Sequence, residues 1–125
     1  MIVSIGIDIM DVERIAQSLE RTARLRDRLF TPAEIAYCEQ HASKYEHYAG
    51  RFAAKEAVLK ALQTGWSGGI GWQDVEILPS DEGPPRLLIT GLARKRLEEM
   101  GVNRWHISLS HTKSYAVAQV VLEKL

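Results

Sequence analysis

Three side chains with the chemistry of a cation and phosphate site stand out in the sequence: Asp8, Glu56 and Lys60. Glu56 and Lys60 lie four residues apart in an apolar, alanine-rich segment, where helical spacing places them one above the other. An exposed ion pair that adds a few tenths of a kcal/mol to the helix is one interpretation. Burying a carboxylate beside Phe52 and Leu59 without a cation is costly, which favours a metal or ion-pair role instead.

Asp8 supplies a second carboxylate near the end of a predicted strand. It follows Gly6 on the same face, and Gly6 leaves space for a bulky neighbour. Capping or turn formation would also explain an aspartate at this position. Together, Asp8 and Glu56 predict a site for a hard cation. Mg²⁺ takes one or two protein carboxylates and completes its shell with water and substrate phosphates, whereas Zn²⁺ prefers His and Cys, so the sequence favours Mg²⁺ beside a phosphate.

Candidate phosphate contacts follow a predicted strand near the C-terminus, at Ser110, His111 and Thr112. Side-chain donors and backbone N–H groups in such a turn can bind an anion. A polar hairpin turn that binds nothing has the same composition. The glycine-rich segment that begins at Gly65 would let the backbone approach a nucleotide, but a glycine loop alone is weak evidence.

An excess of arginine marks residues 14–28, where five arginines and two acidic residues give a local charge of +3. The arginines that share one face of a predicted helix are Arg14, Arg21, Arg24 and Arg28. A solvated basic face is one interpretation, and a docking surface for an acidic protein is the other. Nucleic acid is disfavoured because sixteen basic residues balance sixteen acidic ones in the whole chain and no aromatic residue lies among these arginines.

The elements that must position these side chains indicate a mixed protein of helices and strands. Residues 2–9 predict a strand with Val3, Ile5, Ile7 and Ile9 on its buried face. The other predicted elements are helices from about Val12 and over 31–41, 44–63 and 90–100, and strands over 75–78, 86–90, 105–110 and 115–123. This order predicts an α+β fold, with a small, largely antiparallel sheet packed against helices.

Length and composition place the chain among small globular proteins. Its 125 residues predict a single domain over 1–125, and 46% hydrophobic with 26% charged residues are typical of that class. The apolar N-terminus lacks a basic leader, and no apolar run approaches the roughly 20 residues that span a bilayer, so we expect no membrane segment. A lone cysteine, Cys38, fits a reducing, cytoplasmic location.

The order of these motifs along the chain resembles the holo-acyl-carrier-protein synthase family, the short, single-domain 4′-phosphopantetheinyl transferases. The motifs that carry the resemblance are Gly6-Ile-Asp8-Ile9 followed by Arg14, then Arg51-Phe-Ala-Ala-Lys-Glu56-Ala-Val-Leu-Lys60-Ala, then Ser110-His111-Thr112. One departure is visible. The family commonly has Gly-Thr-Gly after the long helix, whereas this chain has Gln63-Thr64-Gly65, and we expect Gln63 to extend the helix by one residue.

The resemblance implies transfer of the 4′-phosphopantetheine arm of coenzyme A to a serine of apo acyl carrier protein, with release of 3′,5′-ADP, in support of fatty acid biosynthesis. It implies Mg²⁺ on Asp8 and Glu56, with Lys60 assisting the leaving group. The serine proton would pass to Glu56 or to a water near Asp8. A non-catalytic coenzyme A or nucleotide-binding module, or an Mg²⁺-dependent pyrophosphate hydrolase, remains the alternative.

The resemblance also implies where ligand and partners bind. The cofactor contacts it implies are Arg51, Lys60, Gly65, Ser110, His111 and Thr112, and the carrier-protein contacts are Arg14, Arg21 and Arg24. The family's short members are trimers with active sites at subunit interfaces, so the resemblance implies a homotrimer.

Overall fold

The computed structural model describes residues 1–64, 69–80 and 83–125. Its elements are β1 (Ile2–Asp11), α1 (Val12–Arg21), α2 (Leu25–Leu29), α3 (Pro32–Glu39), α4 (Lys44–Leu62), the 3₁₀ helix η2 (Trp72–Asp74), β2 (Val75–Leu78), β3 (Arg86–Ile89), α5 (Gly91–Glu99), β4 (Arg104–His111) and β5 (Tyr115–Glu123). One antiparallel sheet has the order β1-β5-β4, and β2 pairs with β3 in a separate hairpin. The predicted α+β class with small antiparallel sheets is confirmed.

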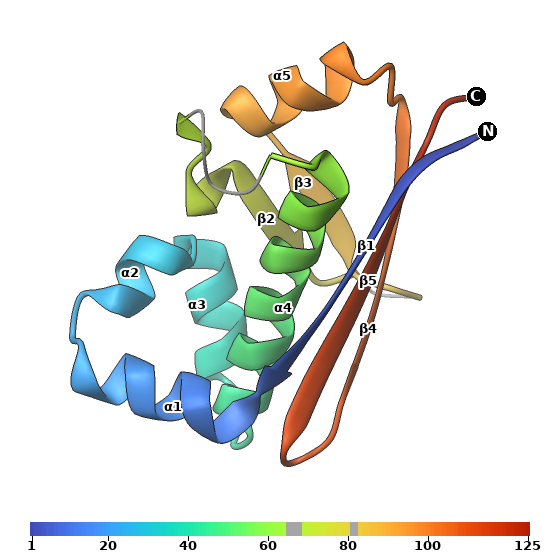
Figure 1. Cartoon of the computed structure of the whole chain (residues 1–125). Coiled ribbons are helices and arrows are strands. Elements are labelled where there is room, and N and C mark those ends of the chain that lie inside the picture. The colour runs from blue at the N-terminus through green and yellow to red at the C-terminus, as the bar shows by residue number, and fades with distance from the viewer. Residues whose placement is uncertain (65–68, 81–82) are drawn as a thin grey trace.

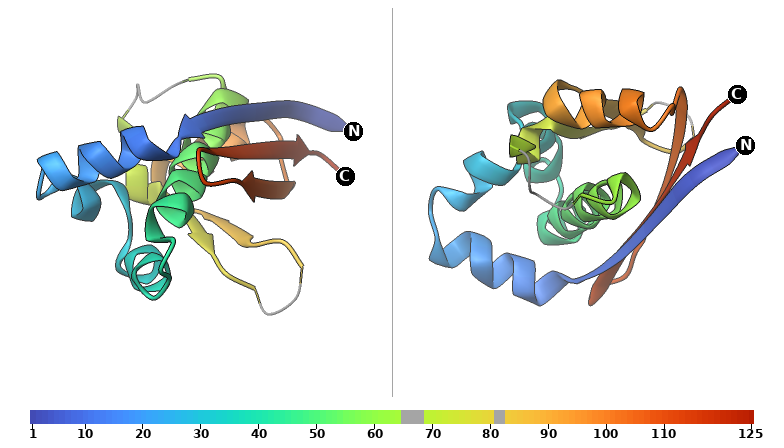
Figure 2. Two further views of the ribbon diagram at one scale, coloured as in Figure 1. Left: turned by 90° about the horizontal axis from the view of Figure 1, so that it is seen from below. Right: turned by 45° about the horizontal axis from the view of Figure 1, so that its top comes forward.

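Helix α4 forms the centre of the molecule, between the three-stranded sheet on one side and helices α1–α3 on the other (Figures 1 and 2). Its alanines allow this close packing, since Ala53, Ala54, Ala57 and Ala61 are fully buried. A Cβ atom at Gly6 would lie 1.9 Å from the carbonyl oxygen of Ala57, so only glycine fits at this crossing. The space that Gly6 leaves is therefore filled by the backbone of α4.

The prediction for the two faces of β1 was wrong. Ile5, Ile7 and Ile9 are between 58% and 64% exposed, while Ser4 and Gly6 are buried beneath α4. The physical reason is the crossing itself, because a helix backbone this close to a strand leaves room only for small side chains. Strand β1 therefore carries a row of exposed isoleucines on the outer face of the sheet, and it is an edge strand.

Helix ends are set by local chemistry that the sequence largely predicts. Thr31 and Glu34 form the expected capping box, in which the Glu34 N–H donates to Thr31 Oγ1 at 3.2 Å and the Thr31 N–H donates to Glu34 Oε1 at 2.9 Å. Gln63 does not extend α4. It adopts a left-handed conformation, with φ 63°, and ends the helix after Leu62.

The predicted helical face that joins Arg14 to Arg28 was also wrong, because the chain breaks between α1 and α2. Helix α1 ends at Arg21, Thr22 caps it, and α2 begins at Leu25. None of the helices in the described ranges has the length and apolar character needed to cross a membrane.

Candidate functional site

Asp8 and Glu56 line the same surface cavity, which has a volume of about 500 Å³. The crossing of α4 over Gly6 at Ala57 explains the juxtaposition, because Glu56 precedes Ala57 and Asp8 follows Gly6 by two residues. The Asp8 side chain is mostly buried, at 17% exposure. The structure therefore brings the two predicted carboxylates to one cavity.

Lys60 joins these carboxylates from the next turn of α4. Its ammonium lies 3.0 Å from Asp8 Oδ1 and donates a second hydrogen bond to the Ile7 carbonyl at 3.1 Å. The side chain is 56% exposed, so the ammonium reaches both β1 and solvent. Lys60 thus places a partly exposed positive charge at the edge of the sheet, beside a carboxylate.

The chemistry of these donors suits a hard cation. Within the described ranges, no group of three or more His, Cys, Asp or Glu side chains is arranged to hold a metal by itself. Two carboxylates at an open cavity are the sparse set that Mg²⁺ uses when substrate phosphates complete its shell. Asp8 and Glu56 could hold such an ion beside a bound diphosphate.

A buried ion pair that the sequence analysis missed supports the wall of this cavity. Lys55 and Glu34 are both fully buried and lie 2.9 Å apart, and the Lys55 ammonium also donates to the carbonyl groups of Trp72 and Val75. Burial lowers the pKa of Lys55, and the adjacent Glu34 carboxylate opposes that shift. The Trp72 ring stacks on Phe52 at 5.3 Å, and both rings line the cavity.

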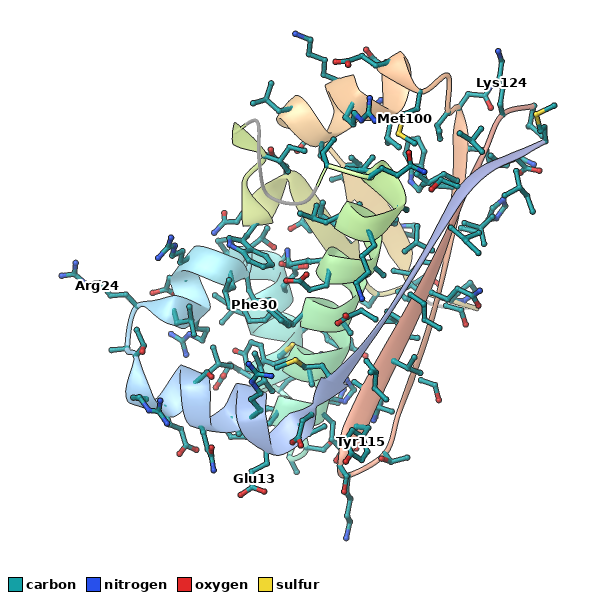
Figure 3. The ribbon with its side chains drawn as sticks, in the orientation of Figure 1. Glu13, Arg24, Phe30, Met100, Tyr115 and Lys124 are labelled. Carbon is teal, nitrogen blue, oxygen red and sulfur yellow. The ribbon has the colours of Figure 1, made fainter. Side chains whose placement is uncertain are left out.

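Arginines form the rim of the same cavity. Arg14 and Arg28 line it directly, although they come from two separate helices. Arg21 and Arg24 are exposed farther along the chain, and Arg24 projects outward from the connection between α1 and α2 (Figure 3). The arginines predicted for docking therefore extend from the cavity over the neighbouring surface.

Arg51 and His111 line a second cavity, of about 200 Å³, which shares no lining residue with the first. Arg51 is only 4% exposed, and its Nε has no hydrogen-bond partner among the described residues. Its guanidinium lies 4.1 Å from the centre of the Tyr37 ring. His111 Nδ1 lies 2.9 Å from a carboxylate oxygen of Glu46, so this nitrogen carries a proton and donates it.

The other predicted phosphate contacts lie at the end of β4 or outside the described residues. Ser110 and Thr112 are exposed, and Thr112 Oγ1 accepts hydrogen bonds from the N–H groups of Ser114 and Tyr115 at 3.2 and 3.1 Å. The Thr112 hydroxyl therefore shapes the hairpin turn. Gly65 lies outside the described residues.

The two cavities face different directions because they use different stripes of α4. Phe52 and Glu56 are one turn apart and line the first cavity, whereas His47 and Arg51 are one turn apart and line the second. Successive residues turn by about 100° around a helix, so the centres of these two stripes diverge by about 140°. Among the residues that the structure describes, the two carboxylates line the first cavity and Arg51 lines the second.

Residues 4–120 match the family model described as the 4′-phosphopantetheinyl transferase superfamily. The chain belongs to this superfamily. It is 48% identical over 124 residues to a holo-[acyl-carrier-protein] synthase of Koribacter versatilis, covering 98% of this chain and 99% of the relative. Among solved structures of this enzyme, the one from Neisseria meningitidis has a TM-score of 0.88 at 34% identity and covers 99% of this chain and 100% of that one.

A transferase structure with coenzyme A (3′,5′-ADP) is also similar to this chain. It is the holo-(acyl-carrier-protein) synthase from Bacillus anthracis, with a TM-score of 0.81 at 37% identity, covering 100% of this chain and 99% of that chain. The superfamily assignment therefore rests on sequence and fold over nearly the whole length.

Proposed function

We propose that this chain is a holo-[acyl-carrier-protein] synthase, which transfers 4′-phosphopantetheine from coenzyme A to a serine of apo acyl carrier protein. The observation that carries the proposal is the cavity shared by Asp8 and Glu56, with Lys60 on Asp8 and arginines along the rim. We place the reaction in the cytoplasm and in fatty acid biosynthesis. The serine oxygen attacks the β-phosphorus, the bond to the departing phosphate oxygen breaks, and 3′,5′-ADP leaves.

Asp8 and Glu56 would hold Mg²⁺, which supplies Lewis-acid polarisation of the phosphate and neutralises its charge. Lys60 is placed to stabilise negative charge on the departing oxygen, because its ammonium is anchored by the Ile7 carbonyl and extends into solvent. Phe52 and Trp72 exclude water from one wall of the cavity. A binding-only module would not require this combination of two carboxylates and a lysine.

The working form that we propose is a homotrimer with active sites between subunits. The exposed isoleucines of β1 form an apolar row whose burial is worth roughly 1.5–3 kcal/mol per side chain. A shallow cavity lined by Ile7, Ile9, Val117, Asp8 and Lys60 joins this row to the proposed metal ligands. A second copy seated there would cover the isoleucines and bring its Arg51 and His111 cavity toward Asp8, which supports the assignment of Arg51, Ser110, His111 and Thr112 to the 3′,5′-ADP portion.

The carrier protein is proposed to dock on Arg14, Arg21 and Arg24. All three side chains are exposed, and the structure gives them no ion pair with any described residue. An acidic partner could therefore pair with them without displacing an existing contact. The continuity of this surface with the Asp8 cavity, through Arg14, would place a carrier-protein serine beside the diphosphate.

The test is to incubate the full chain with coenzyme A, Mg²⁺ and apo carrier protein, and to weigh the carrier by mass spectrometry. Transfer adds the mass of the phosphopantetheine arm. Cleavage of coenzyme A without a heavier carrier would instead indicate a hydrolase, and no change in either molecule would indicate a binding module. Glu56→Gln should abolish the gain, whereas the matched variant Glu99→Gln, on the exposed face of α5, should retain it.

A further inference from the structure

Three histidines from separate parts of the chain stack beside the Arg51 cavity, and we call them the histidine cluster: His41, His47 and His111. The His41 and His47 ring centres lie 4.0 Å apart, and His47 meets His111 edge-on at 5.2 Å. His41 follows α3, His47 lies on α4, and His111 ends β4. Only His111 belongs to a motif that the sequence analysis assigned.

Hydrogen bonds fix the His41 and His111 rings, whereas the His47 ring between them can gain a proton without losing a hydrogen bond to a described residue. His41 Nδ1 lies 2.8 Å from the Tyr37 carbonyl, which can only accept, so this nitrogen donates. His111 Nδ1 donates to Glu46 in the same way. The His47 ring makes no hydrogen bond to any described residue, yet it lines the cavity together with Arg51.

The charge balance of the cavity explains what His47 could do. Among the described residues that line it, the permanently charged side chains are Arg51 and Glu46, which cancel. Burial lowers the pKa of His47 to about 4, and electrostatic interactions with His41, His111 and Arg51 act in the same direction, against an opposing effect of Glu46. His47 is therefore neutral near neutral pH in the absence of a bound anion. Asp81 and Glu82, next to the lining residues Ser80 and Gly83, lie outside the described residues.

A phosphate monoester that entered this cavity would carry up to two negative charges opposite one arginine. Arg51 lines the cavity, its side chain is nine-tenths buried, and its Nε has no hydrogen-bond partner among the described residues, so its guanidinium is the positive group that the phosphate would meet. The negative charge of Glu46 cancels the positive charge of Arg51. A proton on His47 would therefore give the cavity a net positive charge to pair with the phosphate. Burial keeps His47 neutral, and a nearby phosphate dianion would raise the pKa of His47 again. Phosphate binding and His47 protonation would therefore favour each other.

We propose that His47 is a specificity-determining residue for the phosphate monoester of coenzyme A, and that it takes up a proton when this phosphate binds beside Arg51. The proposal rests on the proposed function, because it identifies the ligand as coenzyme A. Proton uptake gives the sign of the pH dependence. Affinity is highest at low pH and falls as pH rises through the pKa of His47 in the complex, by at most about tenfold per pH unit.

The test is calorimetric binding of 3′,5′-ADP to the full chain in its native assembly between pH 5.5 and 8, in two buffers that differ in ionisation enthalpy. We expect the Kd to rise about threefold to tenfold over this range, with proton uptake greatest near neutral pH, because below about pH 6 the free phosphate monoester already carries a proton that it can pass to His47. His47→Phe preserves the ring stack but should abolish the uptake and flatten or reverse the pH trend, since the phosphate's own ionisation near pH 6 favours binding at higher pH. Binding of 5′-AMP, which lacks the 3′-phosphate, should show the same pH trend in the wild type and in His47→Phe.

Transfer kinetics provide an independent measurement. His47→Phe should raise the KM for coenzyme A several-fold more than the KM for dephospho-coenzyme A, because only coenzyme A carries the phosphate monoester that His47 is proposed to contact beside Arg51. His47→Gln, which keeps polarity without a titrating ring, should behave in the same way if His47→Phe folds poorly.

The outcomes separate this proposal from the proposed function. If 3′,5′-ADP binds to His47→Phe and His47→Gln with the pH trend and proton uptake of the wild type, His47 does not recognise the phosphate. The inference is then wrong, while the transferase assignment stands. If neither 3′,5′-ADP nor coenzyme A binds to the wild-type chain, both are wrong. Equal losses for 3′,5′-ADP and 5′-AMP would show that His47 packs against the nucleoside and would overturn the phosphate assignment.

Discussion

Lys60 on α4 and Asp8 on β1 are 52 residues apart in sequence, and the lysine Nζ lies 3.0 Å from Oδ1 of the aspartate. The same ammonium is held by the Ile7 carbonyl, so its position does not depend on Asp8 alone. A metal that took an oxygen of Asp8 would leave Lys60 anchored to the backbone beside it. The two contacts therefore hold the Lys60 ammonium beside Asp8, where we propose that it stabilises the departing phosphate oxygen.

The first prediction follows from this anchoring. Lys60→Met should lower kcat by about 100-fold while changing the KM for coenzyme A much less, because a charge that develops only on the departing oxygen acts in the transition state. Steady-state transfer assays measure both quantities. Lys95→Met, on the exposed side of α5, is the matched control and should retain wild-type kcat. A mutant loss confined to KM would assign Lys60 to ground-state binding instead.

The second prediction concerns the exposed face of β1. Ile7 is 58% exposed, and a lysine in its place should prevent a second copy from covering the row, giving a monomer with little transfer activity. Light scattering after size exclusion measures the assembly. Leu92→Lys, at a position on α5 that is 44% exposed, should leave the assembly unchanged. A fully active monomer of Ile7→Lys would contradict shared active sites.

Sequence periodicity predicted the elements well but not which side of β1 is covered. Alternation correctly places Ile5, Ile7 and Ile9 on one face of β1. The prediction failed because it assumed that an apolar face is buried in the core of its own chain. What decides the burial is the approach of α4 to Gly6, a contact between residues about 50 positions apart. The Asp8–Glu56 cavity depends on the same contact. It was predicted from the residue types and the resemblance, and no local pattern contained its geometry.

Other features of the site were missed for related reasons. Lys55 lies in the most informative segment of the sequence, yet its role depends on Glu34 and on the Trp72 carbonyl, which reach it only in the fold. The sequence did offer one indication, because Lys55 lies among the buried alanines of this helix and a buried lysine needs an anionic partner. His47 had no motif, and only the convergence of α3, α4 and β4 makes it part of a cluster.

A third prediction tests the arginine surface. Arg21→Glu combined with Arg24→Glu should raise the KM for the carrier protein about tenfold or more at low salt and flatten its salt dependence, because an attractive surface acts mainly on association. The matched double reversal is Lys95→Glu, on α5, with Lys124→Glu, which lies at the opposite side of the molecule from Arg24 in Figure 3; it changes the net charge equally. Equal effects of the two double variants would mean that net charge alone matters.

A fourth prediction concerns stability and pH. Because the pKa of His47 is lowered to about 4 in the fold, the unfolded chain binds this proton more readily, so the contribution of neutral His47 to stability is lost as pH falls from about 6.5 toward 4. His47→Phe should therefore show a smaller fall in Tm over this window than the wild type, at equal protein concentration. Thermal unfolding followed by circular dichroism measures it, and parallel Tm curves for the two proteins would refute the assignment.

The last prediction uses the helix end that departs from the family pattern. Gln63 has φ 63° and ψ 22°, a left-handed conformation in which a Cβ atom costs about 1 kcal/mol and glycine costs little. Its N–H donates to the Leu59 and Lys60 carbonyls at 3.1 Å, and its side chain adds a long hydrogen bond from Nε2 to Ser4 Oγ at 3.5 Å, so the backbone supplies most of what fixes the turn. Gln63→Gly should therefore raise the free energy of unfolding by about 0.5–1 kcal/mol. The higher conformational entropy of glycine in the unfolded chain reduces this gain. Gln63→Asn should fall between, and Gln63→Ala should gain nothing. Chemical denaturation of the series measures the order, and a gain for alanine equal to that for glycine would mean that the backbone conformation is not the source of the strain.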